Sequence, residues 1–125
     1  MPKILVVEDN ELSREMLSRR LKRKGFSVIA AEDGEQGYAR ARSESPDVIL
    51  MDISLPGING WEVIEMLKSE PDARDIPLIV LTAHALVTDR ARADEVGCDA
   101  YFSKPVDFER LLEAIGRALT ERKPA

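Results

Sequence analysis

Five residues of this chain have side chains that together could bind a metal ion and transfer a phosphoryl group. They stand at or just after the ends of apolar runs, and they are Glu8, Asp9, Asp52, Thr82 and Lys104. Carboxylates that lie close together repel one another and raise each other's pKa, unless a cation lies between them. Oxygen ligands of this kind suit Mg²⁺, which keeps several waters and prefers to share a phosphate. The lysine and the hydroxyl would then bind phosphoryl oxygens, and Asp52 would be the nucleophile that forms an acyl phosphate.

Each of these residues also has a purely structural explanation when it is taken alone. An acid at the end of a strand is often simply solvated, a threonine there usually bonds to the backbone, and a lone lysine is normally a surface charge. What favours the functional interpretation is that one such group, or a pair, follows strand after strand.

The run Val48-Ile49-Leu50-Met51 leads directly into Asp52 and is followed by the turn-forming Pro56, Gly57 and Gly60. A continuous apolar run bounded by such residues predicts a strand that is buried on both faces. Ligands of open α/β sheets bind at the carboxyl ends of the strands. We therefore expect Asp52 to be presented at the mouth of the sheet.

Strand and helix patterns alternate five times along the chain. Strands are predicted over residues 4–7, 26–31, 48–52, 78–81 and 100–103, and helices after Asn10, after Asp33, over 61–68, over 86–96 and from 108. Such alternation predicts a parallel sheet with right-handed crossovers and helices on both faces. All five strands then end at the same edge, which brings the candidate residues together.

Two of the predicted helices have informative apolar patterns. Leu12, Met16, Leu17 and Leu21 have helical spacing after Asn10, which predicts the buried side of the first helix. The helix over residues 86–96 is poor in large apolar residues, so we expect it to be weakly anchored.

Composition limits the classes of function. The 125 residues suffice for one domain, and we take residues 1–125 as that domain. A net charge of −5 argues against a general nucleic-acid or membrane-surface binder. The single cysteine, Cys98, excludes an internal disulfide framework, and the first apolar run is too short for a signal peptide or a membrane span. We expect a cytoplasmic protein.

Four segments, in order and with family-like spacing, resemble the signature of response-regulator receiver domains. They are Val6-Val7-Glu8-Asp9-Asn10, the segment from Met51 to Gly60, Leu81-Thr82-Ala83 and Ser103-Lys104-Pro105. The resemblance covers essentially the whole chain. It implies a flavodoxin-like, doubly wound, five-stranded parallel sheet of order 2-1-3-4-5 with five helices. It also implies that Asp52 accepts a phosphoryl group from a phosphohistidine of a sensor histidine kinase or a histidine phosphotransferase.

The resemblance further implies roles for the other site residues. Glu8 and Asp9 match the acidic pair that holds Mg²⁺, with Asp9 as the direct ligand, Asp52 sharing the ion and the backbone carbonyl of Ser54 as a further ligand. Thr82 matches the switch hydroxyl, Lys104 the phosphoryl-binding lysine and Tyr101 the switch aromatic. The Lys104-Pro105 peptide bond is expected to be cis.

The implied output is a change in a protein-binding surface, with a downstream protein target on the Leu86–Asp107 face. Enzymatic activity would be at most Mg²⁺-dependent self-phosphorylation and autodephosphorylation. The chain ends soon after its last helix, which favours a stand-alone regulator of the DivK-like or CheY-like kind. The alternative is a receiver domain excised from a longer regulator or a hybrid kinase.

Two other classes of protein were weighed. A Mg²⁺-dependent aspartyl-phosphate phosphatase of the haloacid dehalogenase kind needs a second acid two residues after the nucleophile, where this chain has Ser54. A flavodoxin-like FMN binder needs a phosphate-binding loop after the first strand, where Glu8 and Asp9 would repel phosphate.

Overall fold

The computed structural model of the chain describes residues 1–55, 57–83 and 87–121, and it confirms the alternation of strands and helices. The strands are β1 (Lys3–Val7), β2 (Ser27–Ala31), β3 (Val48–Asp52), β4 (Leu78–Thr82) and β5 (Ala100–Ser103). The helices are α1 (Glu11–Arg23), α2 (Gly34–Glu44), α3 (Gly60–Lys68), α4 (Val87–Glu95) and α5 (Phe108–Glu121).

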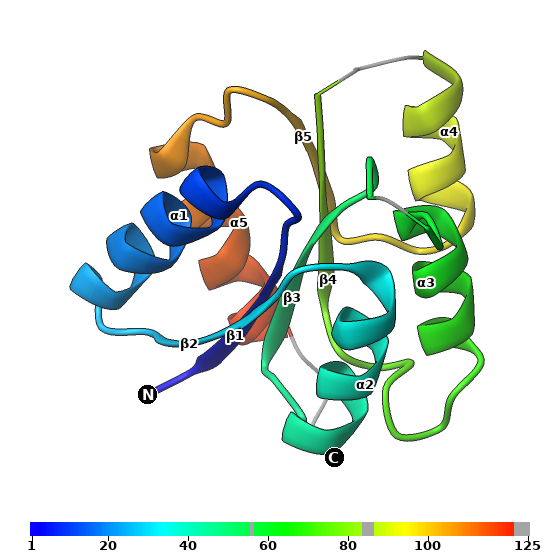
Figure 1. The fold of residues 1–125 in the computed structure, drawn as a ribbon, viewed down its shortest axis with the longest axis horizontal. Helices are drawn as coiled ribbons and strands as arrows, with labels where there is room; N and C mark the ends of the chain where they lie inside the picture. The colour runs from blue at the N-terminus through cyan, green and yellow to red at the C-terminus, as the bar shows by residue number, and fades with distance from the viewer. Residues whose placement is uncertain (56, 84–86, 122–125) are drawn as a thin grey trace.

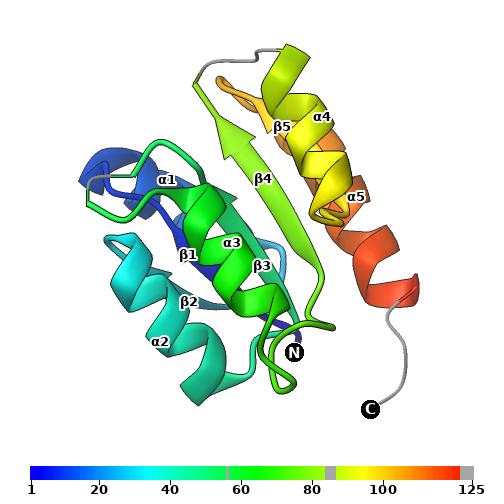
Figure 2. The ribbon, with the colours of Figure 1, turned by 90° about the vertical axis from the view of Figure 1, so that its right-hand side faces the viewer.

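The five strands form one parallel sheet in the order β2-β1-β3-β4-β5, as the resemblance implied. All four neighbouring pairs are parallel. Helices α1 and α5 lie on one side of the sheet, and α2, α3 and α4 lie on the other (Figure 1). Figure 2 views the same arrangement from the side of α3 and α4. The strand order reverses between β1 and β3, which is where ligands bind in sheets of this kind.

The three inner strands β1, β3 and β4 bury both of their faces, as their continuous apolar runs predicted, whereas the edge strands β2 and β5 are only partly buried. Leu5, Ile49 and Val80 belong to the core beneath α2 and α3. Their chain neighbours Ile4 and Leu50 belong to the core beneath α1 and α5. Successive side chains of a strand point to opposite faces, so this alternation follows directly from strand geometry.

Short polar side chains begin the helices. Asn10, Asp33 and Asn59 each accept a hydrogen bond from the backbone N–H three residues later, and so cap α1, α2 and α3. Asp107 accepts from the N–H of Glu109 at the start of α5. Beyond the end of α1, Gly25 has a φ of 93°, a left-handed conformation that glycine adopts without strain.

The structure corrects the predicted buried side of α1. Leu12 is 67% exposed and Met16 is 52% exposed, while Leu21 is buried and Leu17 packs against the core only in part. The spacing of these residues identified a helix, but the buried stripe is narrower than the pattern suggested. The buried and half-buried positions of the helix form a stripe that does not include Leu12 or Met16; they are Arg14, Leu17, Ser18 and Leu21.

The described side chains of α4 agree with the weak anchoring that its composition predicted. Ala93 is buried, and it is the one buried side chain among those that the structure describes on α4. Leu86, where we expected this helix to begin, lies outside the described residues. Within the described chain, no helix combines the length and the apolar character that crossing a membrane would need.

Candidate functional site

The predicted site residues meet at the carboxyl ends of β1, β3, β4 and β5. Glu8 and Asp9 follow β1, Asp52 closes β3, Thr82 closes β4, and Lys104 follows β5. Asp52 lies on β3 beside β4, with Leu81 as its register partner. Parallel pairing alone thus brings together groups that are far apart in the sequence.

Lys104 lies between two of the carboxylates. Its Nζ donates to Oε1 of Glu8 at 2.8 Å, to Oε2 of Glu8 at 3.0 Å and to Oδ2 of Asp52 at 2.8 Å. The predicted repulsion among the acids is therefore offset by a cation that the protein itself supplies. Charge-assisted hydrogen bonds of this length are among the strong ones in proteins.

Asp52 lies at the carboxyl edge of the sheet, as expected, but it is covered from solvent there. Asp52 is only 3% exposed and Glu8 only 4% exposed. The cause is that Lys104 lies over both carboxylates, while β3 is an interior strand with neighbours on each side. Asp9, one residue farther along the loop, remains exposed.

The loop after β3 holds the second oxygen of Asp52. The backbone N–H of Ser54 donates to Oδ1 of Asp52 at 2.8 Å. The same loop is closed by the N–H of Gly60, which donates to the carbonyl of Ile53 at 3.2 Å. A Cβ at position 60 would lie 2.4 Å from Cα of Ile53, so only glycine permits this close approach.

The shared environment separates the pKa values of the two buried acids. Burial raises the pKa of Glu8 to about 7, and Asp52 adds to that rise more than Lys104 reduces it. Burial would also raise the pKa of Asp52, but hydrogen bonds with Glu8, Lys104 and the Ser54 N–H outweigh it and lower this pKa. At neutral pH the pair thus retains a proton part of the time, held on Glu8, while Asp52 stays ionised as a nucleophile must.

Lys104 keeps its charge in this environment. Burial by itself would lower the pKa of Lys104, but its hydrogen bonds to Asp52 and Glu8 raise that pKa above the ordinary value. The ammonium group is therefore available to bind phosphoryl oxygens at any physiological pH.

The donor set fits a magnesium ion. Glu8, Asp9 and Asp52 each offer a carboxylate oxygen, and these oxygens lie within 4.8 Å of one another. An all-oxygen set with one exposed member suits an ion that keeps several of its waters. The further ligand predicted at the backbone carbonyl of Ser54 stays a prediction.

The two predicted switch residues occupy neighbouring strands. Thr82 is buried at the end of β4, and its carbonyl accepts the backbone N–H of Lys104 at 2.7 Å. Tyr101 is half-buried on β5, where the guanidinium of Arg90 on α4 lies 5.9 Å from its ring centroid. The predicted cis peptide bond between Lys104 and Pro105 is present. The switch roles themselves stay predictions.

Sequence reasoning missed Arg14, which contacts the acidic loop. Its Nη1 donates to the backbone carbonyl of Glu8 at 2.9 Å. A signal was present, because an arginine near the start of a helix opposes the helix dipole and needs another reason to be there.

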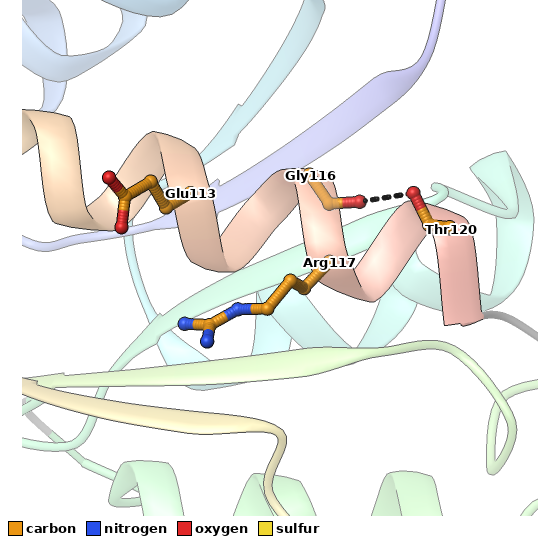
Figure 3. A pocket seen from close by; sticks show the side chains of 4 residues that line it. All are labelled: Glu113, Gly116, Arg117 and Thr120. Carbon is orange, nitrogen blue, oxygen red and sulfur yellow. Dashed lines mark hydrogen bonds between the residues drawn. The ribbon is translucent and has the colours of Figure 1, made fainter.

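A hollow of about 500 Å³ lies along α5, away from the predicted site residues, and is lined by Glu113, Gly116, Arg117 and Thr120 (Figure 3). The hydroxyl of Thr120 donates to the carbonyl of Gly116 within the same helix at 2.9 Å. None of the site residues predicted from the sequence lines this hollow.

Comparison with known proteins gives a uniform result. The sequence model of the response regulator receiver domain matches residues 4–116. The polar-differentiation response regulator DivK of Brucella anthropi is 40% identical over 116 residues, which are 92% of this chain and 94% of that protein.

Solved structures agree with this match. A CheY-like receiver domain protein from Methanospirillum hungatei superposes with a TM-score of 0.91 at 29% identity, covering 98% of this chain and 96% of that one. The receiver domain of a signal transduction histidine kinase from Syntrophus aciditrophicus has a TM-score of 0.88 at 29% identity, covering 100% of this chain and 96% of that one.

Proposed function

Because this chain belongs to the response regulator receiver domain family, we propose that Asp52 is its phosphoacceptor and that Glu8, Asp9 and Asp52 hold Mg²⁺. The chain is DivK-like and acts in two-component signalling, where phosphorylation on aspartate is typical of the family. One observation carries the proposal. It is the ionised, buried carboxylate of Asp52 at the end of β3, with the Lys104 ammonium 2.8 Å away.

The chemistry follows from these positions. A carboxylate oxygen of Asp52 attacks the phosphorus of a phosphohistidine, an oxygen–phosphorus bond forms, and the phosphorus–nitrogen bond breaks. The electron pair of that bond returns to the imidazole, which takes up a proton. Lys104 turns from the carboxylates to the phosphoryl oxygens, and Ser54 N–H keeps the Asp52 side chain oriented. Bound Mg²⁺ would supply further positive charge to the transferred group.

The donor in this proposal is a sensor histidine kinase or a histidine phosphotransferase. The relatives are named as regulators or receiver domains, one of them a receiver domain of a histidine kinase. Both a stand-alone regulator and a receiver within a longer protein therefore fit this fold. The proposal includes a cytoplasmic location, which the single, unpaired Cys98 supports.

The proposed output is a downstream protein that binds the face from α4 to the start of α5. Among the described side chains of α4, few apolar ones contact the rest of the protein. Arginines of α4 make several of the contacts that the structure describes. Arg92 lies 3.4 Å from Glu65 and 5.3 Å from the ring centroid of Trp61, both on α3. Exposed contacts of this kind contribute little stability, so α4 can shift at low cost.

Phosphorylation can be tested directly with acetyl phosphate and intact-mass measurement. The wild-type protein should gain one phosphoryl group in the presence of Mg²⁺ and none in excess EDTA. Asp52→Asn should gain none, whereas Asp75→Asn, the same change at an exposed position, should behave as the wild type. A full adduct on Asp52→Asn would show that another residue is the acceptor, and a full adduct in EDTA would exclude the metal requirement.

A further inference from the structure

The side chain of Arg14 is placed in a way that helix formation does not explain. It stands near the N-terminus of α1, where the partial positive charge of the helix disfavours a cation. Its side chain is only 13% exposed, although arginine is rarely buried unless it is paired. The position must therefore be stabilised by contacts outside the helix.

Those contacts join the loop after β1 to the end of β2. Nη1 of Arg14 donates to the carbonyl of Glu8 at 2.9 Å and lies 3.5 Å from the carbonyl of Asp9. Nη2 lies 3.6 Å from Oε1 of Glu32, which follows β2. The two terminal nitrogens of the guanidinium thus connect the backbone of Glu8 and Asp9 to Glu32 at the end of β2. An ammonium group has all its donors on one atom and lacks this spread.

Arg14 and Lys104 contact the acidic pair in different ways. Lys104 binds the carboxylate of Glu8, whereas Arg14 donates to the backbone carbonyls of Glu8 and Asp9. These hydrogen bonds of Arg14 do not use the carboxylate oxygens of Glu8, Asp9 and Asp52, one of each lying within 4.8 Å of the others. A cation so placed can orient the acidic loop without occupying its ligand atoms.

We propose that Arg14 is a positioning residue for the divalent cation site, and that Glu32 in turn holds its guanidinium in place. The inference rests on the proposed role of Glu8, Asp9 and Asp52 as magnesium ligands. Removing a group that hydrogen-bonds to metal ligands and orients them typically lowers metal affinity by about 10–100-fold.

The sign of the effect separates positioning from simple electrostatics. If Arg14 acted only through its charge, removing it would strengthen Mg²⁺ binding, because one positive charge near the site would be lost. If Arg14 positions the loop, removing it weakens Mg²⁺ binding in spite of that lost charge. Arg19, an exposed arginine on the same helix, provides a control with the same change in net charge.

The experiment is a Mg²⁺ titration followed by backbone amide NMR shifts of residues 8–10, well below the melting temperature. Arg14→Gln should bind Mg²⁺ about tenfold more weakly than Arg19→Gln, and Arg14→Lys should also bind more weakly, since its charge is kept but its fork is lost. At saturating Mg²⁺, Arg14→Gln should recover the wild-type rate of labelling by acetyl phosphate. A general loss of stability would not produce this separation of affinity from rate.

The outcomes decide between the hypotheses. The positioning role is overturned if Arg14→Gln binds Mg²⁺ more tightly than Arg19→Gln does. It is also overturned if the binding is weaker by less than about threefold. If Arg14→Gln does not fold, Arg14→Lys decides by comparison with the wild-type protein, which has the same charge: Mg²⁺ binding less than about threefold weaker overturns the positioning role. If the wild-type protein itself neither binds Mg²⁺ nor accepts a phosphoryl group at Asp52, the proposed function fails instead.

Discussion

Nζ of Lys104 lies 2.8 Å from Oδ2 of Asp52, although 52 residues separate the two in the chain. The same nitrogen bonds both carboxylate oxygens of Glu8. Three groups that would each be costly to bury alone are thus buried as one network. Such networks are stable only while every member keeps its partner.

Replacing Lys104 should therefore destabilise the metal-free protein. Lys104→Met leaves Glu8 and Asp52 facing each other without a cation, and we expect a loss of about 2 kcal/mol. That is below the 3–5 kcal/mol of a fully buried pair, because the Lys104 side chain is 28% exposed. Urea denaturation measures the change, with Lys24→Met at an exposed position as control. Equal stabilities of the two variants would contradict the network.

The metal-free protein should lose stability as pH rises through the range in which Glu8 ionises. The pKa of Glu8 is about 7 in the folded protein, against an ordinary value of 4.5. Its contribution to the free energy of unfolding is therefore full below about pH 4.5 and is lost as pH approaches and passes about 7. The lowered pKa of Asp52 acts in the opposite direction. Its contribution to the free energy of unfolding is present at higher pH and is lost only as pH falls through that lowered pKa.

Glu8→Gln isolates this effect, because the amide cannot ionise. Denaturation experiments at pH 5 and pH 8 should show that the free energy of unfolding of the wild type falls between these pH values. The fall should be smaller in Glu8→Gln. Mg²⁺ binding to the wild type should strengthen over the same interval, since the ion requires the ionised carboxylate. Parallel pH profiles for the two proteins would exclude Glu8 as the titrating group.

Thr82 should transmit the change at Asp52 to the surface. A phosphoryl oxygen on Asp52 should attract the Thr82 hydroxyl through a hydrogen bond to a charged acceptor, and this shift should alter the packing around Tyr101 on β5. The beryllofluoride complex imitates the phosphoryl group. We expect it to change backbone NMR shifts in β5 and in the described part of α4, and Thr82→Ala to bind it with most of those distant changes lost.

Val80 lies on the same strand two residues earlier and is the register partner of Tyr101 on β5. Val80→Ala serves as the comparison, since it alters packing beside Tyr101 but keeps the Thr82 hydroxyl. Distant shifts that persist in Thr82→Ala would show that the hydroxyl is not the connection. A ligand shifts such an equilibrium only by its differential affinity for the two states, so binding and switching have to be measured separately.

Several features of this protein follow from the sequence by itself. Apolar runs of four residues predicted the inner strands β1, β3 and β4, because a strand covered on both faces excludes polar side chains. The alternation with helices made the sheet parallel, and the ends of parallel strands meet at one edge. These two patterns place five residues at one site from the sequence alone: Glu8, Asp9, Asp52, Thr82 and Lys104. The strand order 2-1-3-4-5 and the cis bond at Lys104-Pro105 came from the family resemblance, since no local pattern specifies them.

Other features were decided only by the tertiary structure. Helical spacing cannot tell how much of a helix the sheet covers, so Leu12 and Met16 matched the pattern of buried residues and yet lie exposed. Lys104 was expected to await a phosphoryl group, but in the absence of one it bonds to the acids themselves, because buried carboxylates require a cation. Arg14 reaches across two loops to backbone carbonyls that carry no side-chain signature. Such pairings depend on distances between elements far apart in the chain, which local periodicity does not contain.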